Sequence, residues 1–314
     1  MAHVFLSLAE VVHDPASVIT VGSFDGLHCG HRVILEELKY AARQRAASTT
    51  VVTFEPHPQL VVQLNSQTPI QILSTLAEKL ELLQECGIDR IVAIPFTKEF
   101  SQTPSEKFVR EILYATLGMQ AIIIGHDHSF GKNREGDFAT LASLGKELHF
   151  EVTDLPPFAC NGTVVSSTRI RHALLNGEIE QANAWLGSTY RFTGKVVRGE
   201  GRGRTLGVPT ANLEPVSAHK LIPANGVYAV RASVHGKSYG GMMNLGTRPT
   251  FNGQARSLEA HLFDFSENVY EELLEIRFIA RLRAERKFDS LEALKAQLQA
   301  DRIASLKKLA ENSC

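Results

Sequence analysis

Short runs of almost uniformly apolar residues recur through the first half of this 314-residue chain and limit what that half can fold into. Such runs are typical of strands buried on both faces of a parallel sheet, because helices then cover both sides. Stretches with helical spacing, at 75–85 and 105–116, separate them. This alternation predicts an α/β doubly wound parallel sheet built on Val18–Val21, Thr50–Phe54, Arg90–Ile94 and Ala121–Ile124.

The pattern changes beyond Leu186, where strands of alternating character follow one another without helices between them. An antiparallel β-barrel is the simplest solution for strands at 190–197, 227–234, 239–244, 258–265 and 274–282. We therefore expect two domains, 1–186 and 187–314. A C-terminal helix closes the second, and its apolar stripe is expected to be a packing face: Leu291, Leu294, Leu298, Ile303, Leu306 and Leu309.

Two histidines lie three residues apart where the first apolar strand gives way to a helical pattern. The first turn of a helix offers unpaired backbone N–H groups and the positive end of the dipole, and imidazoles at i and i+3 share one face. A lone histidine there is more often a cap or a core residue, but glycines around this pair let the backbone approach a ligand. The segment predicts a triphosphate site, with His28 and His31 as catalytic candidates and Gly22, Phe24, Asp25 and Gly30 as nucleotide-binding candidates.

A second helix begins with hydroxyl side chains and an arginine, in the segment Ser-Ser-Thr-Arg at 166–169. Serine and threonine at such a position often serve only as helix caps. The functional alternative is a second phosphate clamp facing the histidines, since displacement at phosphorus needs charge neutralised from both sides. On that reading Ser167 and Thr168 bind the nucleotide and Arg169 takes part in catalysis.

A glycine-rich segment in the second half leads to Pro-Thr-Ala-Asn at 209–212. Its glycines match neither common phosphate-loop pattern, and a flexible barrel loop would also explain them. Thr210 and Asn212 supply hard oxygen donors directly after a turn-setting proline, which suits Mg2+ held together with triphosphate oxygens. We expect Thr210 and Asn212 to bind the metal, and Gly199, Gly207 and Thr210 to bind nucleotide.

Composition narrows the class of partner. The 33 Lys and Arg residues are balanced by 34 Asp and Glu residues, which argues against a nucleic-acid partner and leaves small phosphorylated ligands. No membrane span or signal peptide is indicated, so we expect a cytoplasmic location. The four cysteines lack paired spacing, so neither a thiolate zinc site nor a disulfide framework is supported. Oligomeric state is left open.

Over nearly its whole length, the chain resembles the bifunctional riboflavin kinase/FMN adenylyltransferases of bacteria. The segment His28–His31 is similar to the HxGH signature of the nucleotidyltransferase superfamily, and 209–212 to the PTAN motif of riboflavin kinases. Further segments resemble the family in the expected order: 53–58 (TFEPHP), 125–131 (GHDHSFG), 166–171 (SSTRIR), 244–251 (NLGTRPTF), 258–261 (LEAH) and 283–288 (RAERKF).

This resemblance implies a Rossmann-like adenylyltransferase domain followed by a riboflavin kinase barrel. Riboflavin, FMN and ATP are the implied substrates, FMN and FAD the products, and Mg2+ the metal. Glu259 is implied to be the base for the ribityl 5′-hydroxyl, while His28, His31 and Arg169 position ATP and stabilise charge. The implied flavin-binding residues are Phe54, Asp127, Asn244 and Arg283.

Two other functions remain open on the sequence. One is a nucleotidyltransferase for a different phosphorylated acceptor, with the barrel as an accessory flavin-binding domain. The other is a flavin-binding or interaction protein whose catalytic sites are degenerate. A nucleic-acid-binding barrel is the least favoured, because the basic stripe that such a surface needs is missing.

Overall fold

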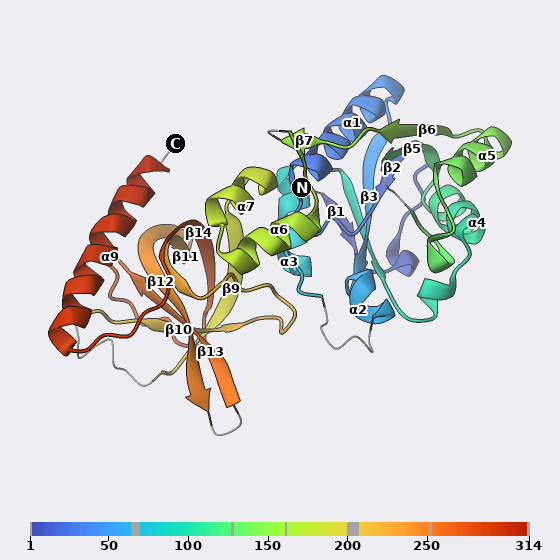
Figure 1. Cartoon of the computed structure of the whole chain (residues 1–314). Coiled ribbons are helices and arrows are strands. Elements are labelled where there is room, and N and C mark those ends of the chain that lie inside the picture. The colour runs from blue at the N-terminus through green and yellow to red at the C-terminus, as the bar shows by residue number, and fades with distance from the viewer. Residues whose placement is uncertain are drawn as a thin grey trace. The chain divides into compact units, whose positions relative to one another are not determined.

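The computed structural model describes residues 2–63, 70–126, 129–160, 162–199, 207–250 and 253–312. The chain divides into two compact units, Met1–Ser167 and Thr168–Cys314. Figure 1 labels many of the helices and strands of each.

A six-stranded parallel sheet forms the centre of the first unit, with strand order β1-β4-β3-β2-β5-β6. The order reverses between β2 and β5, and in such sheets ligands bind beyond the carboxyl ends of the strands at that point. The expected doubly wound sheet is confirmed, with two edge strands, β1 and β6, that were not predicted. The strands are β1 (His3–Phe5), β2 (Ser17–Val21), β3 (Ser48–Glu55), β4 (Arg90–Pro95), β5 (Met119–Gly125) and β6 (Glu151–Leu155).

Helices cover both faces of this sheet and create two cores. Helices α1 (Cys29–Arg45) and α3 (Leu76–Glu85) pack on one face, in a cluster that includes Val18, Val51 and Ile91. Helices η3 (Phe108–Thr116) and α5 (Phe138–Leu148) pack on the other, in a cluster that includes Ile19, Val52 and Val92. Neighbouring residues of one strand enter different cores, which is why the runs are apolar throughout.

The connecting segments contain short elements. The stretch predicted to be helical at 105–116 forms one turn of α4 (Ser105–Lys107) and then η3, which has wide, π-type turns. The remaining elements are η1 (Leu8–Glu10), α2 (Pro58–Val62), η2 (Phe100–Gln102), η4 (Lys132–Arg134) and a hairpin of β7 (Ala159–Cys160) and β8 (Thr163–Val164).

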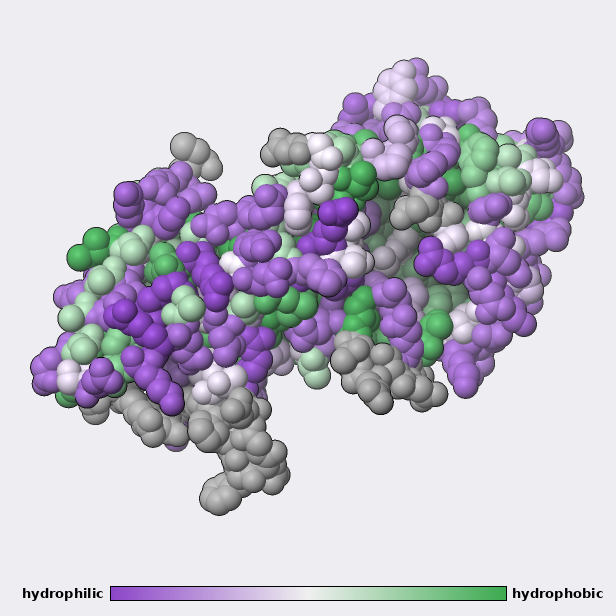
Figure 2. Space-filling model, viewed as in Figure 1, coloured by the Kyte–Doolittle hydropathy of each residue, from purple (hydrophilic) through white to green (hydrophobic). Residues whose placement is uncertain are grey.

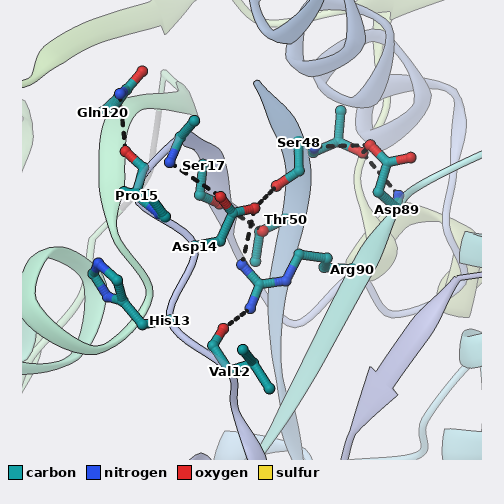
Figure 3. Close-up of polar contacts among 12 residues, drawn as sticks. Val12, His13, Asp14, Pro15, Ser17, Ser48, Thr50, Asp89, Arg90 and Gln120 are labelled. Carbon is teal, nitrogen blue, oxygen red and sulfur yellow. Dashed lines mark hydrogen bonds and ion pairs between the residues drawn. The ribbon is translucent and has the colours of Figure 1, made fainter. Parts of the chain in front are cut away.

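A polar network fixes the opposite edge of the sheet, where β2, β3 and β4 begin (Figure 3). The carboxylate of Asp14 accepts hydrogen bonds from Ser48 Oγ at 2.5 Å and from the Ala16 N–H at 3.1 Å, and Arg90 lies 3.4 Å away. The guanidinium of Arg90 also donates to the carbonyl of Val12. These bonds therefore join the loop before β2 to the first residues of β3 and β4, at the end of the strands opposite the one where ligands bind in such sheets.

Replacing Asp14 by Asn should destabilise the first unit by about 1–2 kcal/mol at pH 7, because the buried Arg90 loses its ion pair. Burial raises the pKa of Asp14, but bonds from Ser48 and Ala16 and the charge of Arg90 outweigh it, so the pKa lies below 3.8. Its charge therefore stabilises the fold above pH 3.8, and this contribution is lost as the pH falls through the lowered pKa. Urea unfolding of the wild-type protein and the variant should differ at pH 7 and converge under acid conditions; an equal difference at both would contradict the role.

A closed antiparallel barrel forms the second unit, with strand order β10-β13-β12-β11-β14-β9. Its interior is filled by side chains that solvent does not reach, among them Phe192, Tyr228 and Phe278. The expected barrel is confirmed, and β10, which was not predicted as a strand, pairs with both β9 and β13. The strands are β9 (Tyr190–Val197), β10 (Ala211–Pro215), β11 (Gly226–Val234), β12 (Lys237–Thr250), β13 (Gly253–Leu262) and β14 (Leu273–Arg283).

Two helices precede the barrel, α6 (Ser167–Asn176) and α7 (Ile179–Leu186). Asn183 of α7 donates to the carbonyl of Phe278 and accepts from the N–H of Tyr190, so this helix is anchored to β14 and β9. Contacts thus group both helices with the barrel. That the two functional domains meet at 186–187 stays a prediction.

The C-terminal helix α9 (Leu291–Glu311) packs on the barrel through only part of the predicted stripe, since Leu309 is buried and Leu298 packs against the same cluster. Its buried residues are Asp301, Ser305 and Leu309, whereas Leu291, Ile303 and Leu306 are exposed. Figure 2 shows hydrophobic residues among hydrophilic ones on its surface. At about 100° per residue, Ile303 points roughly 120° away from Leu309, so the six residues never formed one face.

Candidate active sites

The loop after β2 has an uncommon backbone. Phe24 and Leu27 adopt positive φ angles of 47° and 41°, although neither is glycine, and both side chains are buried. Such conformations cost of order 1 kcal/mol each and persist where the surroundings enforce them. The N–H of Gly22 donates to Val52 O of the neighbouring strand. The loop therefore delivers the next residues, His28 to His31, in a fixed orientation.

His28 and His31 form a stacked pair at the start of α1. Their ring centroids lie 3.6 Å apart with 15° between the planes. His28 is the N-cap of the helix, and its Nδ1 accepts from the N–H of His31 at 3.3 Å, so Nε2 carries the hydrogen of the neutral ring. A Cβ on Gly30 would lie 3.2 Å from the His28 ring, which explains the glycine between them.

The environment of His31 favours its neutral form. Burial, the neighbouring His28 and the positive charge of Lys79 all hold the pKa of His31 well below 6.5. Its Nδ1 atom is buried and has no hydrogen-bond partner among the described residues. At neutral pH this ring is therefore uncharged, so it can donate a hydrogen bond but carries no positive charge.

Asp25 braces the loop. Its buried carboxylate accepts from the N–H groups of Leu73 and Ser74 at 2.9–3.0 Å, immediately before α3. The N–H of Gly26 donates to Ser74 Oγ, and Ser167 Oγ donates to the carbonyl of Asp25. These bonds position the histidine pair; contact of Asp25 with nucleotide stays a prediction.

Ser167 is the last residue of the first unit, and its hydroxyl lies 2.9 Å from the carbonyl oxygen of Asp25 in the histidine loop. Helix α6 begins there, as the sequence predicts. Thr168 and Arg169 belong to the second unit. Their position opposite the histidines therefore stays a prediction.

Phe54, the predicted flavin-side residue of the first unit, belongs to an aromatic group at the end of β3. Its ring contacts Phe96 at 5.5 Å and Phe100 at 6.1 Å, and Phe96 contacts Phe100 at 5.7 Å. The sequence analysis did not predict a role for Phe96 or Phe100. Two phenylalanines that follow the buried strand β4 are the sequence feature that could have indicated an aromatic group there. Asp127 lies outside the described residues.

Lys79 was also missed. It lies on α3 with 3% of its surface exposed, and its ammonium donates to the carbonyl of Ser23, which follows β2, and to that of Phe54, near the end of β3. The signal was present in the sequence, since Lys79 falls on the same helix face as Leu82 and Leu83, which are buried.

In the barrel, the strand register brings three predicted residues into one row. Asn212 of β10 pairs with Glu259 of β13, and Glu259 pairs with Asn244 of β12. Directly opposed residues project from the same face of a sheet. Asn244 in turn pairs with Val227 of β11, and Val227 pairs with Arg283 of β14, so the row extends to Arg283. Two residues along from Asn244, Met242 packs with Leu309 of α9, so the row lies on the outer face that α9 partly covers (Figure 1).

The glycine-rich segment contacts this row where the backbone of Gly199 lies against the side chain of Asn212. A Cβ on Gly199 would overlap the side-chain amide of Asn212, so only glycine lets the backbone pass so closely. Gly207 adopts a φ of 74°, which glycine tolerates best, and Thr210 is half-buried. The glycines at 201 and 203 lie outside the described residues.

Glu259 and Arg283 have different hydrogen-bond partners. Ser257 Oγ donates to Glu259 Oε1 at 3.3 Å, and the glutamate side chain is half-buried. Arg283 instead makes a bidentate pair with the buried Asp301 of α9, with Nη2 at 2.8 Å and Nε at 3.0 Å. Arg283 therefore anchors α9, and its contact with flavin stays a prediction.

His261 holds the segment that carries Thr210. Its Nδ1 donates to the carbonyl of Pro209 at 2.7 Å. Burial lowers the pKa of His261, the bond to Pro209 raises it, Arg302 lowers it, and the net direction is downward. The ring is therefore neutral at pH 7 and its Nδ1 carries the hydrogen.

In the riboflavin kinase reaction expected from the sequence, replacing His261 by Leu should raise the KM for ATP about fivefold, with a smaller change in kcat. The bond that fixes Thr210 is lost, and such a bond contributes about 1 kcal/mol. His261→Asn keeps an N–H donor near the Nδ1 position and should behave closer to the wild-type protein. Steady-state kinetics decide; equal KM values for Leu, Asn and wild type would contradict the role.

Among the described residues, no helix has the length and apolarity needed to cross a bilayer.

Two family models match in order along the chain: FAD synthetase over residues 11–169 and riboflavin kinase over residues 186–309. Relatives described as bifunctional riboflavin kinase/FMN adenylyltransferase occur in Listeria monocytogenes, 38% identical over 92% of this chain and 91% of the relative, and in Escherichia coli K12, 37% identical over the same shares. The Pseudomonas fluorescens relative is 36% identical over 94% of both chains.

A solved structure described as a macrolide-efflux protein from Streptococcus pneumoniae is similar as well. It shares 29% identity, with a TM-score of 0.85 over 97% of this chain and 98% of that one. The two family models match in the same order as the two units, and the relatives cover nearly the whole chain. The chain belongs to the family of bifunctional riboflavin kinase/FMN adenylyltransferases.

Proposed function

We propose that the barrel unit transfers the γ-phosphoryl group of ATP to riboflavin, and that the stacked histidines of the first unit serve the transfer of AMP from a second ATP to FMN. The products are FMN with ADP, and then FAD with pyrophosphate. The observation that carries the first half is the row Asn212–Glu259–Asn244 on three adjacent strands. The stacked pair His28–His31 at a helix start carries the second half.

In phosphorylation, Glu259 takes the proton of the ribityl 5′-hydroxyl as that oxygen attacks the γ-phosphorus. The half-buried carboxylate lies opposite Asn212, so base and nucleotide-binding side chains share one face. Asn244, opposite Glu259 on the other side, is placed to hold the flavin.

The barrel donors fit Mg2+. No group of three His, Cys, Asp or Glu side chains in the described part of the chain is arranged for a metal. Thr210 and Asn212 instead offer a hydroxyl and an amide oxygen, the hard donors that share Mg2+ with phosphate oxygens. When bound, the ion neutralises charge on the transferred phosphoryl group.

In adenylylation, a phosphate oxygen of FMN attacks the α-phosphorus of ATP and pyrophosphate leaves. The FMN phosphate is already ionised near pH 7, so no strong base is needed. His28 and His31 donate hydrogen bonds to the phosphates, and Arg169 supplies positive charge that stabilises them. Ser167, held at the histidine loop, and Thr168 complete the phosphate site, and Phe54 and Asp127 form the flavin side.

Purified protein incubated with riboflavin, ATP and Mg2+ tests both halves. Chromatography over time should show FMN rising first and FAD following, while FMN supplied with ATP should give FAD directly. FAD formation without FMN formation would leave only an adenylyltransferase with an accessory barrel. Absence of both products would refute the proposal. The cytoplasmic location expected from the sequence stays a prediction.

A further inference from the structure

Lys79 occupies a place where lysine is uncommon. Only 3% of the residue is exposed, and lysines are almost never so fully buried unless paired. Its Nζ donates to the carbonyl of Ser23 at 3.2 Å, to Thr53 Oγ1 at 3.1 Å and to the carbonyl of Phe54 at 3.1 Å. An ammonium has three N–H donors, so all three are used within the protein.

The acceptors belong to two different segments of the adenylylation site. Ser23 lies in the loop that leads from β2 to the histidine pair, and Thr53 and Phe54 end β3 beside the aromatic group. Thr53 Oγ1 lies 3.2 Å from the carbonyl of Ser23, which links the two segments a second time. Lys79 therefore joins the nucleotide side to the flavin side, and it has no free N–H for a substrate phosphate.

We propose that Lys79 is a positioning residue of the adenylylation site, which holds the loop of His28 and His31 against the end of the strand that bears Phe54. This inference rests on the proposed function of the first unit. Lys79 acts through the histidines and the strand end, without touching either substrate.

The positive charge of Lys79 also affects the pKa of His31. Burial lowers the pKa of Lys79 and outweighs the carboxylates of Glu55 and Asp25, which raise it, so the net direction is downward. Burial raises the pKa of Glu55, Lys79 lowers it, and Asp25 raises it. The only described ionisable groups that shift the pKa of His31 are His28 and Lys79, and both lower it. The ammonium thus helps to keep His31 neutral.

Lys79→Met keeps the aliphatic stem and removes the charge and all three donors. The kcat for FAD formation from FMN should fall about 10- to 100-fold, since small displacements of positioned groups cost this much. Riboflavin phosphorylation by the barrel in the same sample should be unchanged, and it serves as the internal control. The pKa of His31, followed by NMR of its imidazole, should rise because a nearby positive charge is gone.

Thr53→Val is the matched variant, because it removes one acceptor and leaves the ammonium in place. It should lower the rate of FAD formation a few-fold and leave the pKa of His31 unchanged. If Lys79→Met does not fold, Thr53→Val carries the test alone: a few-fold loss of rate supports the role, and an unchanged rate overturns it.

Two results with folded Lys79→Met would overturn the inference: an unchanged kcat for FAD formation, or a lowered kcat without any rise in the pKa of His31. Failure of the proposed function is a separate result, because the wild-type protein would then form no FAD in the same assay.

Discussion

Glu259→Gln is expected to lower the rate of FMN formation by about 10²- to 10⁴-fold and to leave the conversion of FMN to FAD nearly intact. General-base assistance typically contributes this much, and the amide cannot accept the hydroxyl proton. Glutamine has nearly the same shape and keeps an oxygen for Ser257, whose hydroxyl now donates to the carboxylate. The loss should therefore fall on kcat. Single-turnover formation of FMN, resolved by chromatography, is the measurement.

The control is Glu214→Gln, an exposed glutamate on the neighbouring strand β10. It removes the same charge from the same barrel and should change neither reaction. Equal losses in the two variants would point to the net charge of the barrel and not to a base. A kcat within threefold of wild type for Glu259→Gln would remove Glu259 from its role.

His28→Ala is expected to have the converse effect, with a loss of about 10²- to 10³-fold in FAD formation from FMN and no loss in FMN formation. The variant removes a hydrogen-bond donor from the phosphate site, and deleting one donor to developing charge costs this much in other enzymes. It also removes the helix cap and the stacking partner of His31. FAD formation should be measured with FMN supplied, so that the barrel does not limit the rate.

His28→Asn separates these effects. Asparagine is a good N-cap and keeps an acceptor for the N–H of His31, so helix stability is retained while the imidazole is lost. Both variants should be slow, but only the alanine variant should lose about 1 kcal/mol of stability. Loss of both activities in either variant, in protein shown to be folded, would contradict separate sites.

The main strands were predictable because burial on both faces leaves an apolar run, and the barrel strands because they alternate. Strands β1, β6 and β10 were not, since these short segments of mixed polarity contain no uninterrupted apolar run and are too brief to show a clear period. The stripe predicted for α9 was only partly right. Leucine spacing did not indicate that Asp301 lies on the buried face together with Leu309, where it pairs with Arg283.

Candidate site residues that belong to a motif could be predicted from the sequence. The tertiary contacts that hold those residues in place could not. The helix face of Lys79 could indicate that it is buried, but not that its ammonium donates to the carbonyls of Ser23 and Phe54, because those depend on the placement of β2 and β3. The tie between His261 and Pro209 joins residues 52 positions apart. Such contacts depend on tertiary structure, which a local pattern does not contain.

The row formed by Asn212, Glu259 and Asn244 limits which insertions and deletions the gene can accept. Because successive side chains of a strand alternate between faces, deleting one codon from β13 between its turn and Glu259 would turn the glutamate inward and bring Leu258 or Ala260 to the outer face. Losses of two residues would restore the face but shift Glu259 away from Asn212 and Asn244. Evolution of this barrel should therefore tolerate length variation in its loops and reject it within these three strands.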